Sequence, residues 1–327
     1  MIVVTGGSGF VGSHLVRLLL ARGEKVRIAD RREPPCDIAL SADFVSVDIC
    51  DDATLRTVFC DAVVVYHLAA NPQLWAHRRG EFQRVNYWGT VHVLQAALRH
   101  RVRRIVHVST ESILTRRGLE DVITENQDVS RREVIGPYCL SKWRAERYVW
   151  LLARAGAPVT IVNPTLPIGP GDWLRTPPTQ MILDICLGKR PAYVVGELNL
   201  IDVRDVALGL ATAAERPPSE HRYILGGENW TIRQLFDTVA RLAGVPPPRW
   251  RIPYPLALTV AYADEFLADL TGRPPQATVT GVKLTRRRMH FDTQRTREEL
   301  RLQPRPVIQS LQEMIAWFRE VRWLPRG

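Results

Sequence analysis

Tyr138 and Lys142 are the two residues whose types and spacing most directly suggest chemistry. They lie four residues apart, and residues four apart share one face of a helix. A lysine ammonium beside a phenol favours the phenolate and lowers a tyrosine pKa that starts near about 10. Such a tyrosine can exchange a proton with an alcohol or ketone near neutral pH. Because this pair also occurs by chance on solvated helices, its meaning depends on the rest of the chain.

A glycine-rich loop supplies that context. It follows an apolar run at residues 2–5 and precedes a helical pattern. The spacing of Gly6, Gly9 and Gly12 suits a tight turn, close approach of the backbone to a pyrophosphate, and close helix–strand packing. Free N–H groups at a helix N-terminus also favour phosphate. We therefore predict a dinucleotide-binding loop whose contacts come from these glycines and from Ser8, Phe10 and Val11.

Asp30 bears on which dinucleotide is bound. A carboxylate at the end of the second predicted strand accepts hydrogen bonds from the adenosine ribose and repels a 2′-phosphate, which favours NAD. Arg31 and Arg32 follow directly and could instead hold that phosphate, so NADP stays open. Further cofactor contacts are expected after the third and fourth strands, from Asp48, Ile49, Leu68, Ala69 and Ala70.

The elements that position these residues alternate between strand and helix patterns. Strands are predicted at residues 2–5, 25–29, 44–47, 62–67, 104–109 and 159–162. Helices are predicted at residues 10–22, 82–99 and 138–155. This alternation is typical of an α/β Rossmann fold with a doubly wound parallel sheet.

The second half has a different composition. Prolines and glycines crowd residues 164–178, which indicates loops around a site. Runs at 198–203 and 222–225 predict strands that rejoin the main sheet, and amphipathic helices are predicted at 230–243 and 306–319. We expect a dinucleotide-binding domain over residues 1–163 with returning elements at about 197–226, and a smaller α/β substrate-binding cap over 164–196 and 227–327.

The net charge of +10 admits an anionic partner such as a nucleotide, a nucleic acid or a membrane surface. Only four of the 44 basic residues are lysine, and the runs at 101–104 and 286–288 lack interleaved stacking aromatics. We expect a small-molecule substrate and no nucleic-acid partner. Weak association with a membrane surface is the minority interpretation.

The five cysteines are odd in number, widely spaced, and absent from C-x-x-C pairs. This pattern predicts a reduced, cytoplasmic protein with no metal site. We expect no signal peptide. We also expect no membrane-spanning helix, because the sequence contains no run of about 18 uncharged apolar residues. The longest apolar region, residues 254–270, is interrupted by Asp264, Glu265 and Asp269.

Taken in order, these motifs resemble the extended short-chain dehydrogenase/reductase family of NAD-dependent epimerases and dehydratases. The matching pieces are the glycine loop, Asp30, Asp48-Ile49, residues 67–70, Asn86, residues 108–110, and Tyr138 with Lys142. The second half most resembles hopanoid-associated sugar epimerases, relatives of dihydroflavonol reductases, through residues 163–170, 190–194 and 223–229.

The resemblance implies roles for these residues. Tyr138 is the general acid/base, Lys142 lowers its pKa and holds the nicotinamide ribose, and the Thr110 hydroxyl bonds the substrate oxygen. His67 is a packed residue, and helices 82–99 and 138–155 pair in a homodimer, with a monomer as the alternative. The cofactor is also contacted by Asn86, Val108, Pro164 and Thr165, and the substrate by Asn71, Trp75, Leu166 and Ile168.

The reaction stays partly open. Dehydratases of this family carry an acidic pair after the Ser/Thr, but here Glu111 is followed by Ser112, which argues against dehydration. We expect an enzyme that moves a hydride to or from a secondary alcohol or ketone carbon of a sugar-like or lipid-linked substrate, as an epimerase or an oxidoreductase. The alternatives are a simple ketone reductase of hydroxysteroid type, and a non-catalytic dinucleotide sensor or RNA-associated protein.

Overall fold

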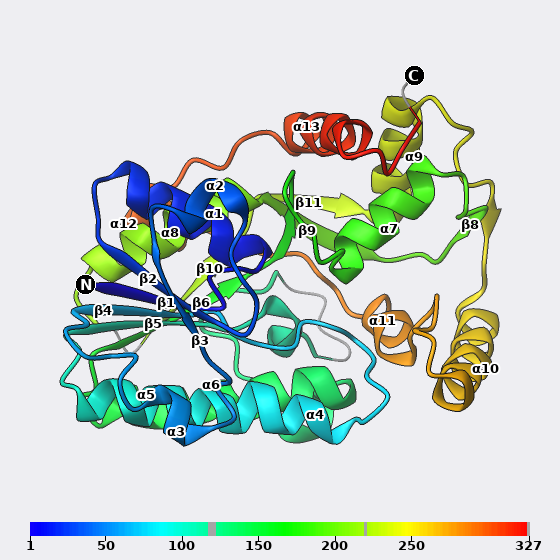
Figure 1. Ribbon diagram of the computed structural model, residues 1–327. Coiled ribbons are helices and arrows are strands. Elements are labelled where there is room, and N and C mark those ends of the chain that lie inside the picture. The colour runs from blue at the N-terminus through cyan, green and yellow to red at the C-terminus, as the bar shows by residue number, and fades with distance from the viewer. Residues whose placement is uncertain (117–121, 219–220, 326–327) are drawn as a thin grey trace.

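A seven-stranded parallel sheet forms the centre of the molecule (Figure 1). The computed structural model describes residues 1–116, 122–218 and 221–325. The strand order is β10-β6-β5-β4-β1-β2-β3. Successive strands are therefore added on one side of β1 up to β3 and on its other side from β4 onward. The strands are β1 (Ile2–Thr5), β2 (Val26–Asp30), β3 (Asp43–Ser46), β4 (Val64–His67), β5 (Arg104–Val108), β6 (Val159–Pro164) and β10 (Arg222–Leu225). The predicted doubly wound α/β fold is confirmed.

Helices cover both faces of this sheet (Figure 1). Val3 and Val4 of β1 point to opposite faces and are both 0% exposed. This double burial explains why the strands are nearly continuous apolar runs. One face packs against α1 (Phe10–Ala21) and α8 (Val203–Glu215), and the other against α3 (Asp52–Leu55), α5 (Gly89–Arg99) and α6 (Gly136–Arg154).

The helix predicted over residues 82–99 is not a regular α-helix. It consists of α4 (Gly80–Phe82), a π-helical segment η1 (Gln83–Trp88) and α5. π-Helical turns inside α-helices are rare and often accompany functional sites. Asn86, one of the predicted cofactor residues, lies in this segment.

A second, three-stranded sheet forms part of the cap. β9 (Glu197–Asp202) pairs in parallel with β7 (Leu166–Ile168) and antiparallel with β11 (Glu228–Thr231). The expectation that residues 198–203 rejoin the main sheet is therefore wrong, whereas β10 does join it beside β6. Leu200, at 0% exposure, packs in the cap core and explains this placement. That core is covered by α7 (Pro177–Cys186), α9 (Ile232–Ala243) and α13 (Val307–Glu320).

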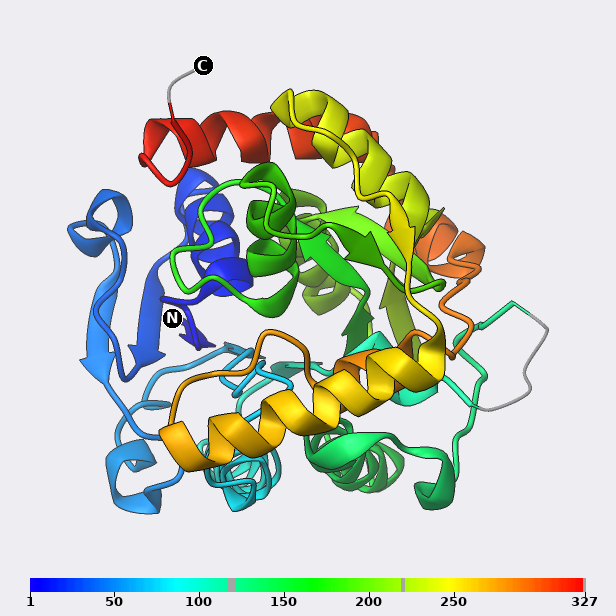
Figure 2. The ribbon, with the colours of Figure 1, turned by 90° about the vertical axis from the view of Figure 1, so that its right-hand side faces the viewer.

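The apolar region at residues 254–270 forms the 18-residue helix α10 (Tyr254–Thr271). α10 runs along the outside of the molecule, and α11 (Val279–Leu284) lies beside it (Figure 2). No helix in the described part of the chain is long and apolar enough to cross a membrane. The remaining elements are α2 (Cys36–Ala39), β8 (Ala192–Tyr193), β12 (Trp250–Arg251), α12 (Gln294–Leu300), and the 3₁₀ turns η2 (Glu111–Leu114) and η3 (Arg131–Glu133).

Two buried histidines lie side by side in the central sheet. His67 and His107 are paired in register on β4 and β5, with ring centroids 5.4 Å apart. The ring nitrogens of His67 lie 2.8 Å from the Thr5 hydroxyl and 2.9 Å from the Thr90 hydroxyl, which confirms that His67 is a packed residue. Burial lowers the pKa of His67 to about 3 and the pKa of His107 well below its ordinary value.

These pKa values predict a loss of stability in acid. Unfolding returns both imidazoles to a pKa near about 6.5, so below that pH the unfolded state binds more protons. The free energy of unfolding should fall by up to about 1.4 kcal/mol per pH unit for each histidine between pH 6.5 and its folded pKa. Urea unfolding at pH 7.5 and 5 measures this slope. His107→Leu should make the slope shallower than in the wild type, and an unchanged slope would contradict the assignment.

Candidate active site

The backbone around the glycine loop is packed so closely that Gly6 and Gly12 leave no room for a side chain. Gly6 has φ +73°, and a Cβ there would lie 2.6 Å from the backbone nitrogen of Ala69. A Cβ on Gly12 would lie 2.1 Å from the Gly6 carbonyl oxygen. In the described chain no side chain caps the N-terminus of α1, which follows Gly9 directly, and its first turn has no acidic residue. The uncapped N–H groups therefore suit a dinucleotide pyrophosphate.

Asp30 is fixed against this loop. Its Oδ2 accepts a hydrogen bond from the Ser8 N–H at 3.1 Å, and its Oδ1 accepts one from the Arg32 N–H at 3.2 Å. The Ser8 hydroxyl in turn donates to the Arg32 carbonyl at 2.7 Å. Asp30 therefore ends β2 with its carboxylate held beside the loop, where ribose hydroxyls would bind, while Arg31 is exposed.

The other predicted cofactor residues follow the neighbouring strands. The Leu68 N–H donates to the Thr5 carbonyl at 3.0 Å, which holds the segment with Ala69 and Ala70 against the glycine loop. Asp48 accepts a hydrogen bond from the Cys50 N–H at 2.9 Å. Ile49 packs against Gly89, where a Cβ would lie 2.6 Å from the Ile49 Cδ1. These segments gather at the carboxyl ends of the strands, the usual ligand edge of an open α/β sheet.

Tyr138 lies near the start of α6, beside the end of β5. Its ring packs edge-on against Phe82, with ring centres 6.2 Å apart. Burial and the nearby Glu111 carboxylate raise the pKa of Tyr138, and an interaction with the Thr110 side chain only partly opposes this rise. The sequence analysis predicted that the pKa of Tyr138 is lowered, so the direction of this pKa shift was predicted wrongly. In the protein alone, Tyr138 therefore holds its proton.

Lys142 lies one turn further along α6 and points at the same strand. Its Nζ donates to the Val108 carbonyl at 2.7 Å. Burial lowers the pKa of Lys142 to about 8, while the negative charge of Glu146 acts in the opposite direction. The ammonium is thus bonded to the end of β5, and Lys142 is not among the groups that shift the pKa of Tyr138.

Thr110 is hydrogen-bonded to its acidic neighbour Glu111. Its Oγ1 donates to the Glu111 Oε2 at 2.8 Å and accepts a hydrogen bond from the Ser112 N–H at 3.3 Å. Ser112 Oγ donates to the other Glu111 oxygen at 3.2 Å. Burial raises the pKa of Glu111, although these hydrogen bonds partly compensate. Thr110 therefore both caps η2 and bonds to Glu111, and these two residues act on the pKa of Tyr138 in opposite directions.

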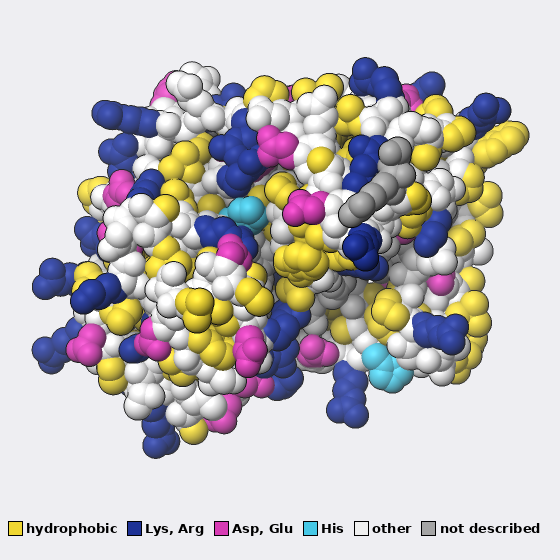
Figure 3. Space-filling view, turned by 45° about the horizontal axis from the view of Figure 1, so that its top comes forward, with side chains coloured by type: hydrophobic (Ala, Val, Ile, Leu, Met, Phe, Trp, Pro, Cys, Tyr) yellow, Lys and Arg dark blue, Asp and Glu magenta, His cyan; other side chains and the backbone are white. Residues whose placement is uncertain are grey.

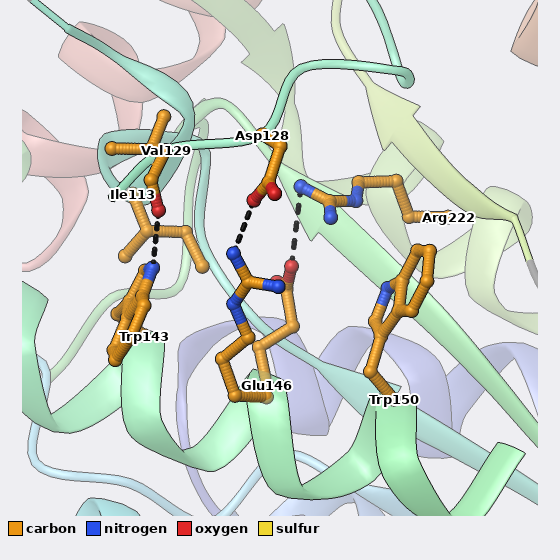
Figure 4. A pocket seen from close by; sticks show the side chains of 8 residues that line it. Ile113, Asp128, Val129, Trp143, Glu146, Trp150 and Arg222 are labelled. Carbon is orange, nitrogen blue, oxygen red and sulfur yellow. Dashed lines mark hydrogen bonds and ion pairs between the residues drawn. The ribbon is translucent and has the colours of Figure 1, made fainter. Parts of the chain in front are cut away.

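A buried chain of hydrogen-bonded polar residues lies behind the site, and the sequence analysis did not predict it. Asn163 Nδ2 donates to the Thr110 carbonyl at 3.0 Å and to the Glu146 Oε2 at 2.7 Å. The other Glu146 oxygen forms an ion pair with Arg222 at 3.2 Å (Figure 4). One signal was available, because Glu146 follows Lys142 by four residues on the same helix. The contribution of Asn163 depends on the pairing of β5 with β6 and has no local signal.

The cavity drawn in Figure 4 lies on the side of α6 that faces Arg222. It has a volume of about 10 Å³, room for roughly one water molecule. Beside it, the Trp143 indole donates to the Val129 carbonyl at 2.8 Å, and Arg147 pairs with Asp128. The contacts around this cavity hold α6 in place, and the cavity itself is too small for a substrate.

Asn86 acts on the backbone of Asn71. Its Oδ1 accepts from the Asn71 N–H at 2.7 Å, and its Nδ2 donates to the Asn71 carbonyl at 3.1 Å and to the Ser141 hydroxyl at 3.0 Å. The π-helical segment, the loop after β4 and α6 are thereby joined at one residue. Asn86 therefore orders the backbone of Asn71, while its contact with the cofactor stays a prediction.

The residues predicted to contact substrate are spread over different surroundings. Ile168 is 0% exposed within the cap core, which makes it a packing residue. Leu166 is partly buried against the same core. The Trp75 indole donates to Asp269 of α10 at 3.2 Å.

The predicted cofactor residue Thr165, which follows Pro164 at the end of β6, is buried and donates to the Asn199 Oδ1 at 2.8 Å.

Comparison with known families identifies the chain. The model of the NAD dependent epimerase/dehydratase family matches residues 2–226. The protein belongs to this family. It is therefore an enzyme of the NAD-dependent type, which agrees with the carboxylate of Asp30 and confirms the resemblance predicted from the motifs.

Curated relatives cover nearly the whole chain. A putative dihydroflavonol 4-reductase of Synechocystis sp. is 34% identical over 322 residues, which cover 97% of this chain and 94% of that protein. Sterol demethylase protein B of Methylococcus capsulatus is 33% identical over 326 residues, which cover 97% and 98%. These matches support the predicted likeness to dihydroflavonol reductases, while the likeness to hopanoid-associated epimerases stays a prediction.

Solved structures show the same fold. The crystal structure of gox2253 is 37% identical, has a TM-score of 0.87, and covers 99% of each chain. A UDP-glucose 4-epimerase of Thermotoga maritima, solved with UDP-glucose, has a TM-score of 0.78 at 20% identity, and the match covers 98% of this family member and 99% of that chain. At that identity the similarity concerns the fold alone.

Proposed function

We propose that the protein moves a hydride to or from a secondary alcohol or ketone carbon, with Tyr138 as the general acid/base. The observation that carries this proposal is the grouping of Tyr138 with Thr110 and Glu111, which are hydrogen-bonded to each other and both affect the pKa of Tyr138, one helical turn from Lys142. A phenol and a neutral hydroxyl can both bond to an oxygen that alternates between alcohol and ketone. A positioned proton donor of this kind is what carbonyl reduction requires.

Each residue has a distinct task in this proposal. Tyr138 holds its proton in the protein alone and delivers it to the substrate oxygen during reduction, or accepts it during oxidation. Thr110 orients that oxygen, and Lys142 stabilises the phenolate once the proton has left. The glycine loop, Asp30 and Lys142 would hold NAD, which supplies the hydride chemistry when bound.

The substrate is proposed to be apolar in part. Two relatives more than 30% identical are named sterol demethylase protein B and a ketoreductase acting on a farnesyl dihydroquinoline oxide. Both names describe lipid-like molecules, which supports a lipid-linked substrate over a purely sugar-like one. An epimerase is the second candidate, supported by the epimerase/dehydratase family to which the chain belongs.

Native mass spectrometry of the purified protein distinguishes these two reactions. We expect no dinucleotide to be retained after dialysis and NADH to bind on addition, because a reductase must exchange its cofactor at every turnover. An epimerase returns the hydride to the same substrate and should retain NAD. Preferential binding of NADPH would contradict the role given to Asp30, and binding of neither dinucleotide would contradict the proposed function.

The homodimer implied by the family resemblance remains a proposal. Trp88 of η1 and Leu151 of α6 are 49% and 68% exposed on the helices expected to pair. Large apolar side chains exposed on two neighbouring helices support such an interface.

A further inference from the structure

The outer face of α10 is apolar along its whole length. Six large side chains of this helix are more than half exposed, and residues three, four or seven positions apart share a face. They are Leu256 (55%), Val260 (51%), Tyr262 (53%), Phe266 (65%), Leu267 (56%) and Leu270 (69%). The buried residues of the helix are the small Ala257, Ala261 and Ala268.

All three acidic residues of α10 are bonded to the body of the protein. Asp264 accepts a hydrogen bond from the Ala277 N–H, and Glu265 accepts one from the Val279 N–H, both at 2.8 Å. Arg79 forms ion pairs with Glu265 at 3.2 Å and with Asp269 at 3.0 Å. A surface helix of a globular protein normally turns its apolar side inward and its charges outward. α10 has the reverse arrangement, so packing within the chain does not account for its apolar face.

Cations surround this apolar face. The Arg286 guanidinium lies 4.6 Å from the centre of the Tyr254 ring, and the Lys283 ammonium lies 5.5 Å from the centre of the Tyr262 ring. The segment immediately before the helix is exposed and contains Trp250, which is 72% exposed, between two arginines. The exposed arginines next to the two ends of α10 are Arg249, Arg251 and Arg273.

We propose that the outer face of α10 binds the surface of a lipid bilayer that contains anionic lipids. Apolar side chains with aromatic and basic neighbours are the combination that inserts at a headgroup boundary. The basic residues complement anionic headgroups, and the net charge of +10 acts in the same direction. In Figure 3, hydrophobic side chains follow the right-hand edge of the molecule, where α10 and the segment before it lie.

Charge favours lipid over a second copy of this chain as the occupant. In a two-fold symmetric contact, the same surface patch meets itself. Cations on the rim of α10, such as Arg286 and Arg251, would then face those of the partner, and like charges across an interface oppose association. Anionic headgroups present the opposite charge at that rim.

Such binding would bring the substrate region close to the bilayer. Asp269 on the inner side of α10 accepts the hydrogen bond from Trp75, a residue predicted to contact substrate. A lipid-like substrate could then pass beneath α10 without crossing water. This consequence rests on the proposed function, whereas the binding to lipid does not.

Vesicle flotation of the purified full-length protein tests the proposal. At low salt, the wild type should float with vesicles of phosphatidylcholine and phosphatidylglycerol, and much less with phosphatidylcholine alone. Leu270→Glu should weaken this binding about 10-fold or more, because burial of a leucine contributes about 1.5–3 kcal/mol. Phe266→Glu should act similarly. Leu40→Glu is the matched control, since Leu40 is 98% exposed at the end of α2, and it should bind nearly as the wild type.

Three results would overturn the proposal. The wild type could fail to float with anionic vesicles, or Leu40→Glu could lose as much binding as Leu270→Glu, which would indicate a general effect of charge. Light scattering could instead reveal a dimer that Leu270→Glu dissociates, which would make this face a contact between two copies. NADH binding by Leu270→Glu, measured in parallel, shows that the variant is folded and separates this proposal from the reaction.

Discussion

Replacing Tyr138 with phenylalanine should lower kcat by about 10²–10⁴-fold, the usual contribution of a general acid/base. The substitution removes the proposed proton donor while leaving the ring to pack against Phe82. The affinity for NADH should stay nearly unchanged, because the glycine loop and Asp30 are untouched. Steady-state rates with a panel of sterol and prenyl ketones, together with NADH fluorescence titration, measure both quantities.

Tyr148→Phe is the matched control for this experiment. Tyr148 lies ten residues further along the same helix and packs against the core beneath the sheet, away from Thr110. Its removal should leave kcat close to that of the wild type. If Tyr138→Phe turns over as fast as this control, Tyr138 is not the acid/base, and a non-catalytic dinucleotide-binding role becomes the better explanation.

Replacing Gly12 with alanine should weaken NADH binding by about 10–100-fold. The new Cβ would lie 2.1 Å from the Gly6 carbonyl oxygen and 2.8 Å from the Gly7 Cα, so the loop itself must shift. Forced displacement in a packed region costs about 1–3 kcal/mol, and each 1.4 kcal/mol corresponds to about tenfold in affinity. Because the loop would be displaced from the N-terminus of α1, this cost should appear mainly in cofactor affinity, which isothermal titration with NADH measures.

Gly80→Ala provides the same chemical change at an open position. Gly80 is the first residue of α4, and a Cβ there meets no atom within 4 Å. This variant should bind NADH as the wild type does. Equal affinities of the Gly12→Ala and Gly80→Ala variants would show that the loop tolerates a side chain, and would remove the steric basis for the pyrophosphate site.

Several features of the site could be predicted from short stretches of sequence. The glycine spacing, Asp30 at the end of β2, and Tyr138 with Lys142 on one helix are all local patterns. The strands of the main sheet were also predictable, because burial on both faces makes them continuous apolar runs. The positions of these residues in the fold were predicted correctly, since each depends on residues that are neighbours along the chain.

Other features were inaccessible to such patterns. The strand β9 has the same apolar character as the strands of the main sheet, yet it pairs with β7 and β11 in the cap. The direction of the Tyr138 pKa shift depends on burial and on Glu111, which lies 27 residues away in sequence. The polar chain through Asn163 and Glu146 requires β6 and α6 to meet.

The sequence by itself determined the family, the glycine loop between β1 and α1, and the placement of Tyr138 and Lys142 on one helix, because these depend on residue types at fixed short spacings. Only the tertiary structure decided which groups surround Tyr138 and which side of α10 faces outward. The orientation of this apolar run is decided by Arg79 and by the N–H groups of Ala277 and Val279, which bind its three carboxylates. Solvation and charge at a site are sums over spatial neighbours, and these neighbours are brought together only by folding.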